Sequence, residues 1–578
     1  MSRTRGKATA TAANWRFYVV IAGLCVLLLL LVGRVLSLQI LDVERGRAFL
    51  QDQGEARALR TAEIPAYRGV ISDRRGEPLA VSTPVLSIWA NPRVLAESGR
   101  LEELAAALPM PLDELKARLA RYAGKQFMYL QRHRVPAEAR AVLELGIPGV
   151  HGEREYQRYY PAGEVAAQLV GFTNVDGKGI AGMELAYNDW LQGVPGRKQY
   201  IKDLHGEVAR DIGVLQPAAP GRDLTLSIDL RLQYLQHREL RRAVTAMEAE
   251  SGSVVTLDSH TGEVLAMVNY PVYNPNGRKS VDASRMRNRA LTDMYEPGST
   301  MKVLTLVAAL ESGRYTPESM IETSPGYIRV GRKTYPDPRN YGEISLTRVI
   351  QKSSQVGVTK IALDIGHESI WNVFDRFGIG HAPGTGFPGE SAGQLPVRTR
   401  WHPTEEVSLA FGYGITATPL QLARAYAAFA NGGVQLPVSL LALQGDVPEG
   451  RRVMDEHMAQ QVLEVLAAVT DEEGTARKAR VPGYRVGGKT GTVHKVGPGG
   501  YDRSRYVALF AGVAPVDNPR IVTVVVINEP QGDTYSGGSA AAPVFSAVTE
   551  GALRLLNIVP TELSAEHKAD APAAGGAA

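Results

Sequence analysis

The sequence has almost no cysteine and no marked excess of either charge. Its 578 residues include one cysteine, Cys25, so no intrachain disulfide is possible. The formal net charge of +4 is nearly balanced over this length and gives no support for nucleic-acid binding. The 11 histidines are scattered, without a His-Glu-x-x-His motif or a Cys/His ligand spacing. We therefore expect neither a metal nor any other cofactor.

The chain is long enough for more than one domain. Hydrophobic content of 44% and charged content of 21% are near the average of globular proteins. A single hydrophobic core stops growing well below this length, which predicts two or three domains.

The N-terminus contains the one long apolar run. Residues 17–32 carry no charge, and the run extends to residue 40 if the side chain of Arg34 snorkels to the interface. Residues 17–40 are therefore predicted to form a transmembrane helix. No small-residue cleavage site follows the run, which favours an uncleaved anchor over a signal peptide. The alternative is a buried helix of a soluble domain.

The charges on either side of this run predict its orientation. Basic residues precede it and the first acidic residues follow it, which places residues 1–16 in the cytoplasm and the chain after about residue 41 outside it. These charges are Arg3, Arg5, Lys7 and Arg16 before the run, and Asp42 and Glu44 after it.

Residues 41–221 read as a mixed domain without a catalytic constellation. A strand-like segment at 69–72 is followed by amphipathic helical patterns at 101–122 and 137–145. Proline and glycine at 216–221 suggest a boundary. We expect a non-catalytic pedestal domain here.

Residues 222–560 read as a second domain of the α+β class. A strand at 224–228 precedes Asp229, which can cap the next helix, and residues 253–257 and 263–268 form a hairpin pattern. Three more strand patterns near the end predict an antiparallel meander, at 485–495, 506–513 and 521–527. The simplest closure puts the early strands beside the late ones, with helices covering the sheet. The tail, 561–578, is rich in Ala, Gly and Pro and is expected to be disordered.

The most reactive pattern is Ser299-Thr300-Met301-Lys302, which follows a Pro-Gly turn and opens an apolar helical run. Residues three apart share a helix face, so the Lys302 amine can reach the Ser299 hydroxyl and act as its base when neutral. Burial and a second nearby cation would both lower the pKa of that lysine. A lone Ser-x-x-Lys carries little weight, and Ser299 could simply cap a helix.

Two further motifs accompany this pair in the order of a known family. Ser353-Ser354-Gln355 lies in a helical context and Lys489-Thr490-Gly491-Thr492 in a strand. With Ser-x-x-Lys they resemble the three motifs of penicillin-binding proteins. Segments outside the motifs resemble class B members of the division type, the FtsI-type D,D-transpeptidases: residues 68–76, 159–161, 182–184, 411–414, 510–515 and 537–538. The resemblance covers most of residues 15–560.

The resemblance implies a fold and a reaction. It implies a penicillin-binding transpeptidase domain with an antiparallel sheet covered by helices, in which Ser299 is acylated by the penultimate D-alanine of a peptidoglycan stem. Lys302 would be the general base, and Ser353 would relay a proton to the leaving amine. Lys489 would add positive potential. An amine of a second stem would then attack the acyl-enzyme and form the cross-link.

The resemblance also implies the substrate-binding residues. The hydroxyls of Thr490 and Thr492 would bind the substrate carboxylate, and backbone N–H groups of Ser299 and Thr492 would form an oxyanion hole. Gly491 and Tyr535 would contact the substrate. Gln355 departs from the family, which usually has asparagine there; it carries the same amide on a longer side chain. It either turns inward to bind the substrate amide or faces solvent.

The resemblance further implies partners and a location. β-Lactams would be covalent inhibitors, and the cross-linked material would be peptidoglycan made from a lipid-linked precursor. Nothing before residue 220 resembles a glycosyltransferase, so the glycan would come from a membrane-embedded FtsW-like polymerase that acts with other division proteins. The site would face the periplasm from the inner membrane.

Two nucleotide-binding patterns compete with this interpretation. Residues 483–490 match a P-loop, but the segment that follows is a poor helix former, and Asn528 stands where a Walker B acid would be expected. Residues 384–389 match a dinucleotide fingerprint, but Pro388 prevents the required helix. We expect a strand and a loop, respectively.

Other functions share the three motifs. A D,D-carboxypeptidase, a β-lactamase and a β-lactam sensor differ in how the acyl-serine is released. An elongation-type transpeptidase and a mainly structural scaffold for division proteins also remain open. The large extra domain and the FtsI-like segments favour transpeptidation during septum formation.

Overall fold

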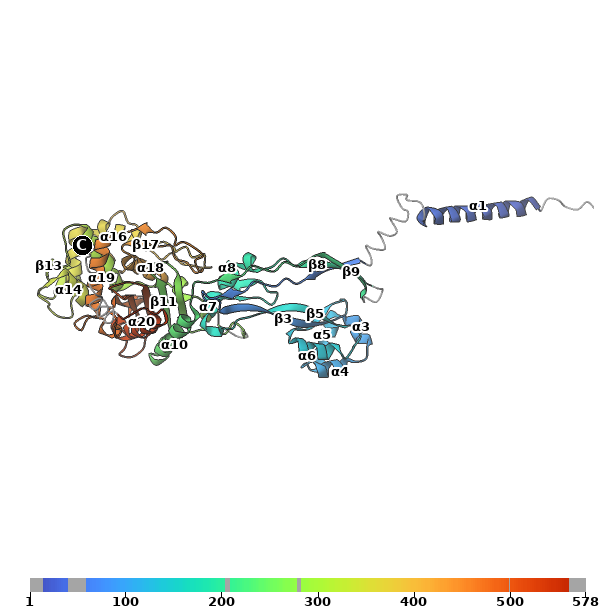
Figure 1. The fold of residues 1–578 in the computed structure, drawn as a ribbon, viewed down its shortest axis with the longest axis horizontal. Coiled ribbons are helices and arrows are strands. Elements are labelled where there is room, and N and C mark those ends of the chain that lie inside the picture. The colour runs from blue at the N-terminus through green and yellow to red at the C-terminus, as the bar shows by residue number, and fades with distance from the viewer. Residues whose placement is uncertain (1–13, 40–58, 203–207, 278–281, 498, 561–578) are drawn as a thin grey trace, which may run out of the picture. The chain divides into compact units, whose positions relative to one another are not determined.

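The computed structural model describes residues 14–39, 59–202, 208–277, 282–497 and 499–560. The chain divides into two compact units (Figure 1). The predicted disordered tail, 561–578, lies outside the described residues.

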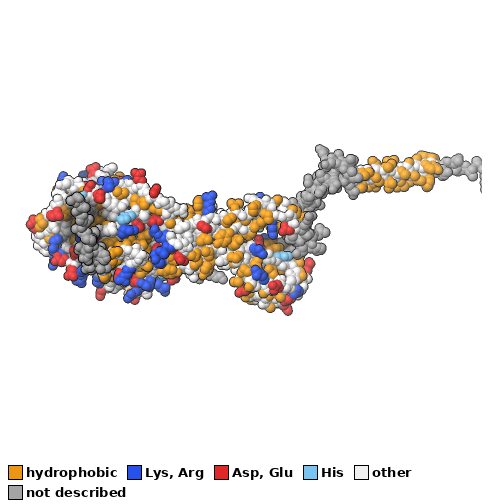
Figure 2. Space-filling view, viewed as in Figure 1, with side chains coloured by type: hydrophobic (Ala, Val, Ile, Leu, Met, Phe, Trp, Pro, Cys, Tyr) orange, Lys and Arg blue, Asp and Glu red, His pale blue; other side chains and the backbone are white. Residues whose placement is uncertain are grey.

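The first unit comprises Met1–Ala66 and Val194–Ala219 and contains the apolar helix. Within α1 (Asn14–Gln39), Trp15–Leu36 is long and apolar enough to cross a membrane, and its side chains are exposed (Figure 2). The same unit has a three-stranded antiparallel sheet in the order β1-β8-β9. Its strands are β1 (Leu59–Ile64), β8 (Gly196–Lys202) and β9 (Val208–Gln216).

The N-terminal part of the second unit is a five-stranded sheet with small helices. β3 pairs with β2, β4 and β5, and β10 joins in parallel beside β2. Leu95, Leu104 and Leu115 from the helices pack against Ile88 of β3 in a separate small core. The elements are β2 (Ile71–Ser72), β3 (Pro78–Ala90), α3 (Pro92–Glu97), α4 (Leu101–Ala107), α5 (Leu112–Tyr122), β4 (Met128–Arg134), α6 (Pro136–Leu143), β5 (Val150–Tyr159) and β10 (Leu224–Thr225).

The helical pattern over 101–122 forms two helices, since α4 ends at Ala107 and α5 begins at Leu112. Pro109 explains the end of α4: the residue before it, Leu108, has extended backbone, as expected for a residue that precedes a proline. Pro111 also has extended backbone and precedes the first helical residue of α5.

Short elements connect this part to the second half of the unit. They are η1 (Gly163–Val165), α7 (Ala167–Val170), β6 (Phe172–Thr173), β7 (Gly179–Ala181), α8 (Gly182–Ala186) and α9 (Asn188–Leu191). Asp73 and Arg74 make direct contacts with the second half. A carboxylate oxygen of Asp73 accepts from the backbone N–H of Leu230 at 2.9 Å, and Arg74 pairs with Glu263 at 3.2 Å. The 68–76 segment therefore joins two parts of the unit.

The second half contains the five-stranded antiparallel sheet that the sequence predicts, in the order β12-β11-β21-β20-β19. The early hairpin lies beside the late meander through β11 and β21, which pair from Ser251 with Asn528 to Asp258 with Ile521. Its strands are β11 (Ser251–Asp258), β12 (Val264–Tyr270), β19 (Gly487–Gly497), β20 (Gly500–Ala514) and β21 (Ile521–Asn528).

Helices cover both faces of this sheet (Figure 1). Asp229 caps α10 (Leu230–Ala246), as predicted, by accepting from the N–H of Arg231. α10 and α20 (Ala542–Leu555) pack together against β12 and β20, and α18 (Pro419–Ala430) packs against β11 and β21. Every residue of β21 is buried, as expected for a strand between two helical layers.

The remaining elements build the region around the site. They are α11 (Ala283–Met286), α12 (Arg289–Thr292), η2 (Gly298–Met301), α13 (Lys302–Glu311), β13 (Met320–Glu322), β14 (Tyr327–Val330), β15 (Lys333–Pro336), β16 (Glu343–Ser345), α14 (Leu346–Lys352), α15 (Gln355–Ile365), α16 (His367–Arg376), α17 (Pro403–Ala410), β17 (Val434–Gln435), β18 (Arg451–Arg452), α19 (Glu456–Thr470), η3 (Arg477–Ala479) and η4 (Gly537–Ala541).

Candidate active site

Ser299 lies in a tight turn that packs against β19. The turn, η2, leads directly into the buried helix α13. Gly298 has a φ of +55°, and a Cβ there would lie 2.4 Å from Cγ1 of Val493, so the position requires glycine on both counts. The hydroxyl of Thr300 donates to the carbonyl of Pro297 at 2.8 Å and closes the turn. Ser299 is consequently held half-buried at the surface of the strand.

Ser353 ends one helix and Ser354 begins the next. Ser353 adopts a left-handed conformation, with a φ of 57°, at the C-terminus of α14. The hydroxyl of Ser354 caps α15 by accepting from the N–H of Gly357 at 2.9 Å. A left-handed conformation is uncommon for serine. Here it reverses the chain between α14 and α15, and this backbone conformation sets the direction of the Ser353 side chain.

Two buried lysine amines meet at the Ser353 hydroxyl. Nζ of Lys302 lies 3.2 Å from Oγ of Ser353 and donates to the Ser353 carbonyl at 2.7 Å. Nζ of Lys489 approaches the same Oγ at 3.1 Å. The side chains of Lys302 and Lys489 are 2% and 0% exposed. Among the described residues no hydrogen bond joins Lys302 to Ser299, which is connected to Lys302 through η2 and the start of α13.

Burial governs the proton affinity of both amines. It lowers the pKa of Lys302 to about 7, although the carboxylate of Asp337 acts in the opposite direction. Burial also holds the pKa of Lys489 well below its usual range, and the charge on Lys302 lowers it further. The expected effect of a second cation therefore falls on Lys489 rather than on Lys302. The ring of Phe411, 4.9 Å from the Lys302 nitrogen, partly compensates the loss of water.

The Lys-Thr-Gly-Thr motif lies on the edge strand β19. Thr490 is 8% exposed, and its hydroxyl lies 3.5 Å from that of Thr475. Thr492 Oγ1 accepts from the N–H of Gly537 at 2.9 Å, which leaves its own O–H free to donate. A Cβ at Gly491 would lie 2.9 Å from the carbonyl of Pro297, so glycine lets the strand approach the Ser299 turn.

Tyr535 and Gln355 lie at the margins of this arrangement. Tyr535 is 41% exposed and stacks on Tyr506 with ring centroids 4.5 Å apart. Gln355 is the first residue of α15 and is half-buried. Its backbone N–H donates to Asp337 at 2.5 Å, while its side-chain amide has no hydrogen bond within the described chain.

Sequence reasoning missed two residues that hold these motifs. Asp337, 8% exposed, accepts from the hydroxyl of Ser354 at 2.6 Å in addition to the N–H of Gln355. The hydroxyl of the fully buried Tyr426 donates to the carbonyl of Thr300 at 2.8 Å. A buried aspartate after a strand and a tyrosine within an apolar helix have no sequence signal of their own.

Both nucleotide-binding patterns are excluded by local structure. The P-loop match, 483–490, runs into β19 and not into a helix N-terminus. The dinucleotide match, 384–389, lies in a loop without helix or strand.

Known proteins resemble this chain over nearly its whole length. Residues 252–550 match the penicillin-binding protein transpeptidase domain, and residues 63–226 match the penicillin-binding protein dimerisation domain. Peptidoglycan D,D-transpeptidase FtsI of Escherichia coli K12 is 42% identical over 570 residues, which cover 98% of this chain and 96% of the relative. The probable peptidoglycan D,D-transpeptidase PenA of Neisseria meningitidis serogroup B is 38% identical over 95% of this chain and 94% of its own length.

Solved structures agree with the sequence matches. Penicillin-binding protein 3 of Mycobacterium tuberculosis in complex with aztreonam superposes with a TM-score of 0.68 at 27% identity, covering 86% of this chain and 98% of that one. The transpeptidase domain of Burkholderia pseudomallei penicillin-binding protein 3 has a TM-score of 0.54 at 41% identity, covering 58% and 97%. With its three motifs in place and both domain families matched, the chain belongs to the class B penicillin-binding proteins, as an FtsI-like serine-type peptidoglycan D,D-transpeptidase.

Proposed function

We propose that the chain cross-links peptidoglycan stem peptides through an acyl-Ser299 intermediate. The proposal is supported by the two buried amines, of Lys302 and Lys489, that both approach the Ser353 hydroxyl. Lys302 begins α13, the helix that follows the Ser299 turn. A lysine with a pKa of about 7 is partly neutral at neutral pH and can accept a proton, which an ordinary lysine cannot.

In the proposed acylation, neutral Lys302 takes the proton of Ser299, whose oxygen attacks the carbonyl of the penultimate D-alanine. Backbone N–H groups of Ser299 and Thr492 stabilise the oxyanion. Ser353 then passes a proton from the lysine to the leaving amine, and the terminal D-alanine departs. Lys489, 3.1 Å from the Ser353 hydroxyl, adds positive potential there in its protonated form; burial opposes that charge, and neutralising Lys302 removes the second cause that lowers the pKa of Lys489.

Substrate binding is assigned to the edge strand and its surroundings. The free O–H of Thr492 and the hydroxyl of Thr490 bind the terminal carboxylate. Gly491 lets β19 lie close to the Ser299 turn, so that a substrate backbone extended along β19 lies beside Ser299. The amide of Gln355 binds a substrate amide, and the exposed ring of Tyr535 packs against the substrate.

We also propose a location and partners. The apolar helix α1 anchors the chain in the inner membrane, with residues 1–16 in the cytoplasm and the catalytic domain in the periplasm. The assigned parts are a span at 17–40, a pedestal at 41–221, a transpeptidase domain at 222–560 and a terminal tail at 561–578. A membrane-embedded FtsW-like polymerase supplies the glycan, and the product is septal cell wall. The names of the FtsI relatives support the peptidoglycan D,D-transpeptidase activity.

The decisive experiment is mass spectrometry of the protein after reaction with penicillin. We expect one adduct, on the peptide that contains Ser299, and none in Ser299→Ala. The matched control is Ser312→Ala, which removes a hydroxyl at the C-terminus of α13 and should leave the adduct intact. An adduct on any other residue would overturn the assignment. In cells, persistence of septal cross-linking with Ser299→Ala would favour a scaffold instead.

A further inference from the structure

A cavity of about 940 Å³ extends along α10, away from the active site. Most of its lining comes from α10, while η1 contributes Val165 and α20 contributes Leu555. α10 packs against β12, and β12 and β19 form the two edges of the sheet. The cavity and the Ser299 turn on β19 therefore lie at opposite edges, and the proposed reaction does not use this cavity.

Four arginines of α10 line this cavity, and all four are exposed: Arg231, Arg238, Arg241 and Arg242. Spacings of three, four and seven residues place them on one face of the helix. The one acidic residue of α10, Glu239, has a side chain that is only 14% exposed. Figure 2 shows basic side chains gathered over α10, which Figure 1 labels. The exposed face of this helix is therefore basic.

Ion pairs shield the first two arginines only from beneath. Arg231 pairs with Asp229 at 2.6 Å, and the Asp229 side chain is 3% exposed. Arg238 pairs with its neighbour Glu239 at 2.8 Å. Neither carboxylate lines the cavity. Because a guanidinium carries five N–H donors, each of these arginines keeps donors free on its exposed side.

The other two arginines are compensated less. Arg241 reaches Glu164, the one carboxylate in the lining, at 3.3 Å, and because both side chains are exposed this pair is weak. Arg242 has no ion pair within the described part of the chain. Burial lowers the pKa of His237, another lining residue, so its ring adds no charge at pH 7. Four guanidinium groups against three carboxylates leave one positive charge in excess.

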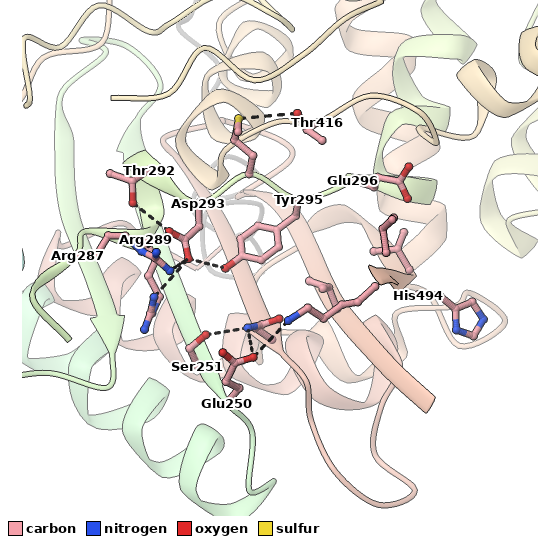
Figure 3. Close-up of a pocket in the computed structure, with 16 residues that line it drawn as sticks. Glu250, Ser251, Arg287, Arg289, Thr292, Asp293, Tyr295, Glu296, Thr416 and His494 are labelled. Atoms are coloured by element: carbon pink, nitrogen blue, oxygen red, sulfur yellow. Dashed lines mark hydrogen bonds and ion pairs between the residues drawn. The ribbon is translucent and has the colours of Figure 1, made fainter. Parts of the chain in front are cut away.

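The cavity beside the Ser299 turn has no such excess (Figure 3). Its lining contains three carboxylates and three cations. Asp293 pairs with Arg287 at 2.8 Å, and Glu250 pairs with Lys495 at 3.3 Å. That cavity therefore selects for neither sign of charge, in contrast to the one along α10.

Apolar and aromatic groups lie among the arginines of α10. Tyr234, which stands between the first two of them in the sequence, is 48% exposed, and Val165, Leu235 and Leu555 supply apolar lining. Exposed tyrosine and arginine together are typical of the centres of protein–protein interfaces. A flat lipid surface does not enter a concave site, and a polysaccharide has no apolar side chains for such a lining. The composition thus favours a protein segment as the occupant.

We propose that this cavity is a docking site for an acidic, amphipathic segment of a partner protein. Its carboxylates bind Arg238, Arg241 and Arg242, since guanidinium–carboxylate pairs are charge-assisted and often bidentate. Its apolar side chains contact Leu235 and Leu555. The helix rises about 17 Å from Arg231 to Arg242, which accommodates about three helical turns of such a segment. This inference is independent of the proposed function.

Photocrosslinking in cells tests the proposal on the full-length chain, with Tyr234 replaced by photoreactive benzoylphenylalanine. We expect irradiation to join this position to a protein segment that mass spectrometry identifies as rich in Asp and Glu with interspersed apolar residues. Combining Arg238→Gln with Arg242→Gln should lower the yield about tenfold or more, because hydrogen bonds to charged groups are lost. The matched control combines Arg93→Gln with Arg121→Gln, two exposed arginines of α3 and α5, and should retain the yield.

A crosslink to lipid, to peptidoglycan or to a basic or uncharged protein segment would overturn the inference. So would the absence of any crosslink, or an undiminished yield in the variant that lacks Arg238 and Arg242.

A second measurement uses the purified full-length protein in detergent, with empty micelles as the blank. The probe is a fluorescent peptide of about 12 residues with Glu and Leu at helical spacing, compared with the same peptide carrying Gln for Glu. We expect the Glu peptide to bind about tenfold more tightly, and the variant lacking Arg238 and Arg242 to lose this preference. Equal binding of the two peptides to the unmodified protein would contradict the proposal.

Penicillin acylation of Ser299 serves as the check on folding. It should be the same in the variant lacking Arg238 and Arg242 as in the unmodified protein, because the cavity lies at the opposite edge of the sheet. Failure of the proposed function would appear as a missing adduct on Ser299 and would leave the binding of the acidic peptide unchanged.

Discussion

Asp337 connects two properties of the site at the scale of a single residue. It holds the start of α15 through Ser354 and Gln355, and its charge raises the pKa of Lys302 against the effect of burial. The balance leaves that pKa at about 7. Since only the neutral amine can accept the Ser299 proton, the rate of acylation should depend on pH in the neutral range.

We therefore predict that the rate of acylation by a fluorescent penicillin falls as pH drops below about 7, about tenfold per unit at the acid limit. In Asp337→Asn the loss of the nearby negative charge lowers the pKa of Lys302, so the midpoint of the profile should move to lower pH. The maximal rate should also fall, because the cap on α15 is weakened. Rates across the neutral range measure both effects.

Asp364→Asn is the control for this profile. Asp364 is an exposed residue of α15, the helix whose start Asp337 holds, and its carboxylate accepts a hydrogen bond from the hydroxyl of Tyr315 and none from the site. It should leave the midpoint unchanged. A midpoint in Asp337→Asn that stays in place or moves to higher pH would contradict the electrostatic role.

The sequence predicted the reactive side chains better than the residues that support them. Ser299, Lys302, Ser353 and Lys489 follow from motifs, and all but the first meet in space as expected. Asp337 could not be found in this way. It lies 17 residues before Ser354, and only the folded path of the chain after β15 brings its carboxylate to the helix end. Sequence motifs identify the reactive residues, whereas a residue such as Asp337, which holds them in place, is identified only by its tertiary contacts.

At the scale of elements, a buried ion-pair network holds β3 and β5 to α8. Glu184, with no exposed side-chain area, accepts from Nε of Arg68 at 2.7 Å and from Nε of Arg158 at 2.6 Å. Arg158 also bonds the hydroxyl of Ser82 on β3. The sequence resemblance included Arg68 and Glu184 in separate segments, and their direct contact is what joins those segments.

We predict that Glu184→Gln lowers the free energy of unfolding by about 3–5 kcal/mol, because it leaves two guanidinium groups buried without their counter-charge. The apparent melting temperature of the purified protein should fall clearly. Glu103→Gln, in an exposed pair with Arg100, is the matched control and should leave the melting temperature unchanged. Equal melting temperatures for both variants would show that the network contributes nothing.

Elements were predictable where pattern and packing agree. The alternation and turns that predict the antiparallel strands correspond to a sheet whose order also follows from simple closure. The pattern over 101–122 forms two helices and not one, because its apolar periodicity continues across Pro109 although Leu108, which precedes that proline, leaves the helical conformation. The ends of helices thus depend on single residues, such as prolines, which a hydrophobic periodicity does not detect.

At the scale of the whole molecule, the function depends on which side of the membrane the catalytic domain faces. Peptidoglycan lies outside the cytoplasm, so the proposed reaction requires the site there as well. The sequence predicts this from the charges around the apolar helix α1. The sheet and the site carry no information about sidedness, and the assignment needs its own measurement.

The single native cysteine makes that measurement direct. In a Cys25→Ser background, Thr245→Cys places a thiol on the exposed face of α10, and Thr9→Cys places one before the apolar helix. We predict that a membrane-impermeant maleimide added to spheroplasts labels the protein with Thr245→Cys at once. The protein with Thr9→Cys should be labelled only after lysis, because a basic N-terminal segment is retained in the cytoplasm. Cys25→Ser alone is the control and should remain unlabelled. The reverse pattern would put Ser299 in the cytoplasm, away from any cross-linked wall, and the proposed reaction could not occur there whatever the geometry of its lysines.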